Sequence, residues 1–142
     1  MTRTRRLKRR TRGMAMVEMV FVLPLLILLV FAIAEFGLMF SRWLTLSNAV
    51  REGAREGVAF RGTIAECNAK VPPVATVVRN KVLSYANAGG IPSTGLTVNV
   101  NNTCGGKGTQ LTVDATYPFT VNIPFAHLSQ VPLSYSSTMR NE

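Results

Sequence analysis

The sequence contains few of the residues that carry most enzyme chemistry. It has one histidine, His127, one aspartate, Asp114, and two cysteines, which lie far apart along the chain. Their spacing is not that of a metal site or a nucleophile with its base, and the glycines at 105–108 lie between expected strands, not before a helix, where a phosphate loop would be. We therefore expect no catalytic residues, no metal and no cofactor, and we do not expect an enzyme.

Acidic residues are also scarce, with seven against sixteen basic ones and a formal net charge of +9. Seven of the basic residues precede Gly13, and no acidic residue does, so the chain after Gly13 is nearly balanced, with nine basic and seven acidic residues. The basic segment contains no aromatic residue, so we expect no nucleic-acid partner. Residues 1–13 are predicted to be an unfolded, solvated arm that stays in the cytoplasm by the positive-inside rule.

A long apolar run follows the basic arm. From Met14 to Phe40 the only charged residues are Glu18 and Glu35. As a helix this run would extend about 40 Å, more than the ~30 Å hydrocarbon core of a bilayer. We predict a single membrane-spanning helix in the lipid bilayer, with the chain outside the cytoplasm from about Arg42 onward. Pro24 lacks an amide donor, so a kink or local unwinding is expected there.

Glu18 is unusual because it lies just inside the apolar run. An ionised carboxylate costs on the order of 3 kcal/mol at mid-bilayer and needs a partner. Cleavage between Gly13 and Met14 would create an α-amino group at the same depth on a neighbouring copy, which suggests an assembly charge pair. The alternative is a secretory signal cut after Ala34, although helical patterning continues well beyond that residue.

Helical periodicity continues from Ser41 to Phe60 and predicts one helix over residues 14–60. One stripe of this segment consists of Trp43, Leu46, Val50, Gly53, Gly57 and Phe60. Ala49, Gly53 and Gly57 form a row of small residues, which lets another backbone approach closely. The interpretations stay open: the row packs on the sheet of this chain, or it packs on a helix of another subunit, or both hold, with one end of the helix buried in the head and the other in an assembly.

Residues 61–142 are predicted to form an extracytoplasmic α+β head with one helix on a small antiparallel sheet of three or four strands. Residues 62–71 resemble a connection, and the helix is expected from Pro72-Pro73 to Gly89-Gly90. Alternating apolar residues indicate strands at 96–100, 111–115, 119–123 and 133–139. Pro118 and Pro124 suggest that the third of these is an edge strand or a bend.

Cys67 and Cys104 lie 37 positions apart in segments predicted to be loops. Outside the cytoplasm a disulfide between them is the simplest interpretation. Loop entropy predicts that it would contribute roughly 4 kcal/mol to stability. Free thiols or a bond between subunits are the alternatives.

Several of these features together resemble the TadE-like family of the tight-adherence (Tad, Flp or type IVb) pilus system. The resemblance covers residues 13–58 and rests on Gly13, Glu18, Leu23-Pro24, Glu35-Phe36-Gly37 and Ser47–Arg55. Met19 stands where the family often has tyrosine. The resemblance implies a minor pseudopilin that prepilin peptidase cuts between Gly13 and Met14, with Glu18 pairing to a neighbouring subunit.

The resemblance also implies a location and partners. The protein would cross the bacterial inner membrane once, with a cytoplasmic amino terminus and a periplasmic or extracellular head. It would interact with other pilin and pseudopilin subunits and the pilus assembly platform, and take part in initiation or tip assembly of a pilus used for adherence. The alternative function is a secreted or tip-located binding module, an adhesin, whose head recognises a surface ligand.

Overall fold

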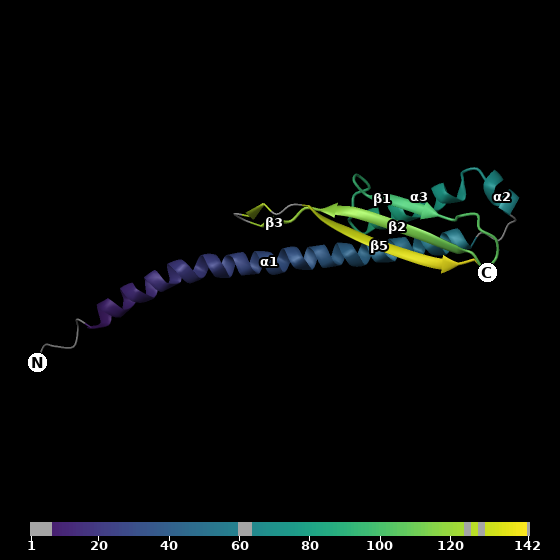
Figure 1. The fold of residues 1–142 in the computed structure, drawn as a ribbon. Coiled ribbons are helices and arrows are strands. Elements are labelled where there is room, and N and C mark those ends of the chain that lie inside the picture. Colours follow the sequence, from purple (N-terminus) through teal and green to yellow (C-terminus); the bar gives the residue numbers. More distant parts are fainter. Residues whose placement is uncertain (1–6, 60–63, 124–125, 128–129, 142) are drawn as a thin grey trace, which may run out of the picture.

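The computed structural model describes residues 7–59, 64–123, 126–127 and 130–141, with side chains for 13–59, 64–122 and 130–141. Its longest element is helix α1, Leu7–Val58, which runs from the basic segment through the apolar run into the head (Figure 1). The predicted continuous helix is confirmed. However, α1 begins at Leu7, so the second half of the arm that we predicted to be unfolded is helical. Leu, Lys and Arg are good helix formers, and no proline separates them from the apolar run.

Pro24 does not interrupt α1, which is helical on both sides of it. Figure 1 shows α1 curving gently towards its amino-terminal end, without a sharp corner. The predicted local unwinding is therefore wrong. The single missing amide donor does not end the helix, which continues through Pro24 over 52 residues.

Two shorter helices follow. Helix α2, Ile64–Ala69, occupies part of the segment that we predicted to be a connection, because its alanines and Glu66 favour a helical turn. Helix α3, Val74–Ala88, begins after Pro73 and ends at Gly89, as predicted. The amide of Gly89 donates to the carbonyl of Tyr85 at 3.1 Å, and Gly90 follows with a φ of +84°. This φ lies in the left-handed region of backbone conformation, which glycine adopts without steric cost because it has no Cβ.

The sheet has three antiparallel strands in the order β1-β2-β5: β1 Thr97–Asn101, β2 Gln110–Phe119 and β5 Val131–Arg140. The predicted hairpin of the first two strands and the final strand are confirmed. The predicted strand at 119–123 is divided: Phe119 ends β2, and the rest enters a separate two-stranded ribbon, β3 Asn122–Ile123 with β4 Ala126–His127.

Pro118 lies in β2, the central strand, whereas we had predicted that it marks an edge strand or a bend. Its register partner on β5 is Pro132, whereas pairing with β1 ends at Thr116. The proline is tolerated because β1 has already ended at this point, so β2 has only one neighbouring strand there.

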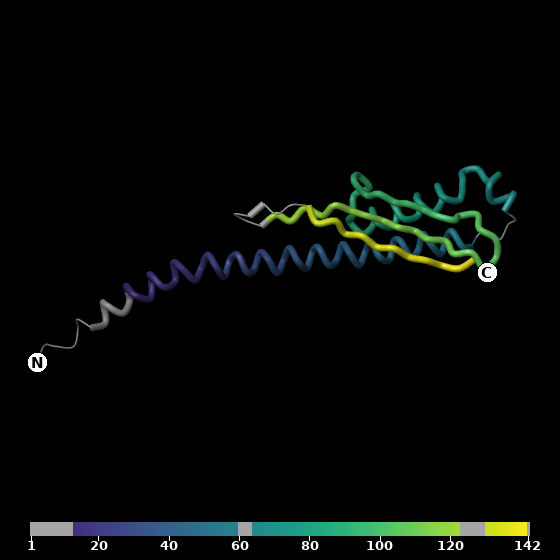
Figure 2. The backbone as a smooth tube through the Cα atoms, viewed as in Figure 1, coloured from purple at the N-terminus to yellow at the C-terminus, as the bar shows by residue number. Residues whose placement is uncertain are grey.

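The core lies between the sheet and the two long helices. Helix α1 packs on β2 and β5, and α3 packs on α1 and β1. Figure 2 shows the second half of α1 alongside the sheet and the first half extending away from the head. Four fully buried residues of the core belong to α1: Leu46, Ala49, Val50 and Ala54. The sequence boundary that we drew between residues 60 and 61 therefore passes through a single packed unit.

Candidate functional site

Helix α1 divides into a part covered by the head and a part that no other element covers. Every residue from 13 to 31 is exposed, and we refer to this as the uncovered segment. Its side chains are large and apolar, with Met14 78% and Phe21 76% exposed. By length and composition, α1 is a candidate membrane span. An apolar surface of this size indicates contact with lipid or with other protein.

The predicted cleavage and charge-pair residues all lie in the uncovered segment. Within the described part of the chain, Glu18 forms no ion pair or side-chain hydrogen bond. Around Gly13, no atom outside the adjoining helix lies within 4 Å of the place where a Cβ would be. The Gly13–Met14 bond is thus helical and unobstructed by the head. Pro24 is also in this segment, away from any contact with the head.

The row of small residues lies in the covered part of α1. Ala49 is fully buried, and a Cβ on Gly53 would overlap the side chain of Val82 in α3. A Cβ on Gly57 would overlap Leu111 of β2. The structure therefore supports the first of these interpretations: the row packs inside this chain and is not available to a second helix. Phe60, the last residue of the predicted stripe, lies outside the described residues.

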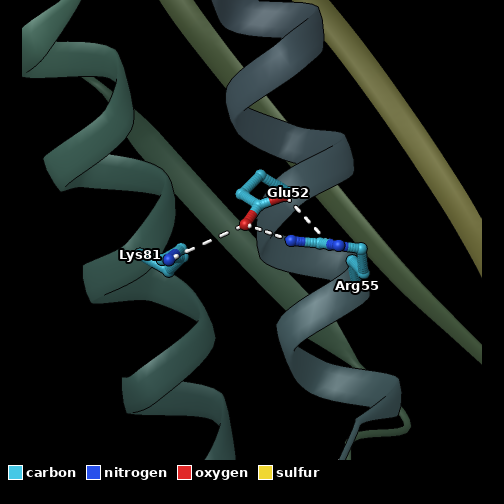
Figure 3. Close-up of polar contacts among 3 residues, drawn as sticks. All are labelled: Glu52, Arg55 and Lys81. Carbon is cyan, nitrogen blue, oxygen red and sulfur yellow. Dashed lines mark hydrogen bonds and ion pairs between the residues drawn. The ribbon is translucent and has the colours of Figure 1, made fainter.

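An ionic cluster joins α1 to α3 at the edge of this packing (Figure 3). Arg55 donates two hydrogen bonds to the carboxylate of Glu52, at 3.0 and 3.1 Å, and the Lys81 ammonium lies 3.7 Å from the same carboxylate. The hydrogen bond from Arg55 is the main cause that lowers the pKa of Glu52. The charges of Arg55 and Lys81 act in the same direction, and desolvation opposes them. The same hydrogen bond raises the pKa of Arg55.

Aromatic residues lie where α1 enters the head. The rings of Phe40 and Trp43 are stacked with centroids 6.1 Å apart, and Trp43 meets Tyr135 of β5 edge to face at 6.1 Å. The Tyr135 hydroxyl accepts a hydrogen bond of 2.9 Å from Nε of Arg51. The Arg51 guanidinium also lies over the Tyr135 ring, 5.4 Å from its centroid, so these contacts add to the packing of the last strand on α1.

A second arginine of α1, nine residues before Arg51, contacts an aromatic ring. The guanidinium of Arg42 lies over the ring of Phe119, 5.0 Å from its centroid. Our sequence analysis did not identify these contacts of Arg42 and Trp43 with aromatic residues of the head as a site. The available signal was the Arg42-Trp43 pair directly after an apolar run, a combination typical of the ends of membrane spans.

The disulfide between Cys67 and Cys104 is confirmed, with their Cα atoms 5.6 Å apart. We had predicted that both cysteines lie in loops. Cys104 does lie in the turn between β1 and β2, but Cys67 lies in α2. The bond fastens α2 to the hairpin. The turn also lines an open hollow, formed by Asn102, Thr103, Cys104, Gly105 and Thr109.

The rest of the head offers a polar face and no metal-ligand cluster. Among the described residues, no three His, Cys, Asp or Glu side chains lie close enough to hold a metal ion. Asp114 lies on the sheet face opposite the core, in register with Asn99 on one side and Ser136 on the other. The side chain of His127 lies outside the described residues.

Comparison with known proteins gives one match. A family model described as TadE-like protein matches residues 13–55, which include the uncovered segment and the first part of the covered helix. The match confirms the resemblance to the TadE-like family over these residues. The chain matches no curated protein and no solved structure.

Proposed function

We propose, from the TadE-like character of residues 13–55, that this protein is a minor pseudopilin of a Tad pilus. The observation that carries the proposal is the uncovered segment: an apolar rod of 19 residues that the head leaves exposed, with Glu18 as its only charged residue. Such a surface is stable in lipid or against other apolar helices. These are the surroundings of a pilin helix before and after assembly into the fibre.

The orientation follows from charge and redox chemistry. Seven basic residues precede Gly13, and such segments stay on the cytoplasmic side of the inner membrane. The head then lies in the periplasm or outside the cell. Disulfides persist in these compartments and are rare in the cytosol, so the Cys67–Cys104 bond supports this orientation.

Processing between Gly13 and Met14 by prepilin peptidase would prepare the helix for assembly. The cut would place an ammonium group on Met14, four residues before Glu18, and the carboxylate of Glu18 would pair with the ammonium of a neighbouring subunit. The absence of a partner for Glu18 within the described part of the chain supports a partner on another molecule. An unpaired carboxylate is costly in an apolar environment, and this cost favours assembly.

Intact-mass spectrometry of the protein purified from membranes of pilus-forming cells tests the proposal. The expected mature chain begins at Met14 and retains its disulfide. A Gly13→Leu variant should keep the basic segment, while Gly37→Leu, at another exposed glycine of the same helix, should be processed normally. A full-length chain in cells that build working pili would overturn the proposed processing, and a chain that begins at Glu35 would support a secreted module.

The exposed polar sheet face favours a second candidate function, a tip adhesin. Deleting residues 61–142 would not test it cleanly, because the core residues of α1 would lose their cover. Substitutions on the face itself, such as Asp114→Lys or Ser136→Arg, leave the core intact. Pili that still form but no longer attach would support the adhesin, and unchanged attachment would argue against it.

A further inference from the structure

The head reaches further along α1 than the three-stranded sheet does. Figure 1 shows β3 projecting beyond the end of the sheet towards the amino-terminal half of α1, and β3 lies against α1. The partly covered positions before Arg42 are Ala32, Glu35 and Met39, spaced three and four residues apart on one helical stripe. Partial burial of α1 on this stripe begins at Ala32, whereas the apolar residues between these positions remain exposed, among them Ile33 at 64% and Phe36 at 63%.

The length of the uncovered segment matches a bilayer. Residues 13–31 extend about 28 Å as a helix, close to the ~30 Å hydrocarbon core. The whole apolar run from Met14 to Phe40 is about 40 Å long, so either the helix tilts or several residues at one end lie outside the hydrocarbon. The head partly covers the carboxyl-terminal end of this run, which includes the charged Glu35. We therefore infer that this is the end that lies outside the hydrocarbon.

The β3–β4 ribbon is unsuited to the hydrocarbon itself. It consists of two strands joined through the pairs Asn122–His127 and Ile123–Ala126, and no third strand of the described chain pairs with it. Each strand therefore has an edge whose backbone groups need water or another polar partner. Open sheet edges do not occur in lipid-exposed hydrocarbon, whereas the headgroup layer contains water.

We propose that the β3–β4 ribbon rests on the headgroup layer of the outer leaflet and thereby sets the depth of α1 in the bilayer. This inference rests on the proposed function, because it requires α1 to span the membrane. The hydrocarbon extends from about Gly13 to about Ala32, not to Phe40, and the partner of the ribbon is a lipid surface. Glu18 then lies inside the hydrocarbon near its cytoplasmic edge, and Glu35 lies outside it.

The exposed aromatic residues between Ala32 and Trp43 fit this arrangement. Helical side chains point back towards the amino terminus, so the rings of Phe36 and Phe40 extend towards the bilayer. Phe36, 63% exposed, is level with the headgroups. Trp43 lies about 18 Å beyond residue 31 along the helix, which places it past the headgroup layer.

Trp43 is the only tryptophan in the chain, so its fluorescence tests the depth directly. The full-length protein is reconstituted in phosphatidylcholine–phosphatidylglycerol vesicles whose lipids carry bromine near the headgroup or deep in the acyl chain. The probe is moved in a Trp43→Phe background by Phe21→Trp, Phe36→Trp or Asn122→Trp. All three replaced residues are exposed, so the larger ring fits.

The inference predicts a distinct result for each position. Deep bromines should remove most of the fluorescence of the Phe21→Trp protein. Only shallow bromines should quench the Phe36→Trp and Asn122→Trp proteins. Trp43 in the unaltered chain should keep its full intensity with either lipid and be quenched by iodide in solution.

Three outcomes would overturn the inference, and they are distinguishable. If Trp43 or the Asn122→Trp probe is quenched by deep bromines while the Phe21→Trp protein is too, α1 spans the bilayer but lies deeper than inferred. If the Asn122→Trp probe is not quenched at all while the Phe21→Trp protein is, α1 spans the bilayer but the ribbon does not reach the lipid, which also overturns the inference. If the Phe21→Trp protein is not quenched, α1 is not inserted, and the proposed function fails together with the inference.

Discussion

Gly53 of α1 lies so close to Val82 of α3 that a Cβ at Gly53 would overlap the valine side chain. The carbonyl oxygen of Val78 is also within 3.4 Å of that position. Alanine normally stabilises a helix interior by about 1 kcal/mol relative to glycine, but overpacking of a core costs about 1–3 kcal/mol. We expect Gly53→Ala to lower the free energy of unfolding by about 1 kcal/mol, measured by urea unfolding in mild detergent micelles.

Gly37 provides the matched control for this prediction. It lies in the same helix, and no atom outside the adjoining helix is within 4 Å of its Cβ position. Gly37→Ala should therefore be neutral or stabilising by up to about 1 kcal/mol. Equal stability changes in the two variants would show that the close approach of α1 and α3 is not a packing constraint.

The disulfide is expected to contribute a large share of the stability of the head. Replacing both Cys67 and Cys104 by serine removes the cross-link without leaving an unpaired thiol. The chain-entropy argument for this loop predicts a loss of about 3–4 kcal/mol, seen as a lower unfolding midpoint in denaturant. The unaltered protein in excess reductant should unfold at the same midpoint as the double variant. A variant as stable as the oxidised protein would contradict a stabilising role.

Glu18→Gln tests the assembly charge pair without removing side-chain volume. The variant should be inserted in the membrane and processed normally, because its apolar segment is unchanged. Its incorporation into pili should fall strongly, since it lacks the charge that attracts the neighbouring ammonium. Immunoblots measure this incorporation as the ratio of the protein in sheared pili to the protein in the membrane fraction.

Glu35→Gln is the matched control for Glu18→Gln, because it removes the same charge from the same helix. Glu35 is partly covered by the head and far from the predicted amino terminus. Its variant should be incorporated normally. Equal loss in both variants, or no loss in either, would contradict a specific role for Glu18.

The ionic cluster at Glu52 predicts a pH dependence of stability. The pKa of Glu52 in the folded state is lowered, chiefly by the hydrogen bond from Arg55, so folding favours the charged carboxylate. The stabilisation is therefore complete above the ordinary carboxyl pKa of about 4.3 and is lost as pH falls through the lower folded value. Urea unfolding of the unaltered protein and Glu52→Gln should differ at pH 6–7 and converge once the pH has fallen below the lowered folded pKa of Glu52. A difference that persists in acid would exclude the carboxylate charge as its cause.

The elements that were predicted correctly are those in which the pattern is local. The apolar run, the valine spacing of α3 and the alternation in β1 and β2 each depend on neighbours within a few residues. Residue type and compartment were enough to suggest the Cys67–Cys104 bond. The errors also have local causes, because α2 is too short to show a period, and one missing amide at Pro24 does not break a long helix.

The candidate site was only partly predictable for the same reason. Gly13 and Glu18 were identified from order along the chain alone. The small-residue row was found, but its partner depends on where α3 and β2 fold back onto α1, which no spacing within α1 specifies. The contacts of Arg42 and Trp43 with Phe119 and Tyr135 join residues that are distant in sequence, so they too were missed.

The order of residues determined by itself that this chain has an apolar helix with one acid near its start, because charge and hydropathy belong to the residues whatever surrounds them. Only the tertiary structure decided how much of that helix remains exposed. Long-range packing buries one face of the second half of α1 under α3 and the sheet, and brings β3 against α1. The surface available to lipid or to another subunit is the part of α1 that the head does not cover. The extent of that part depends on how the chain folds back onto α1.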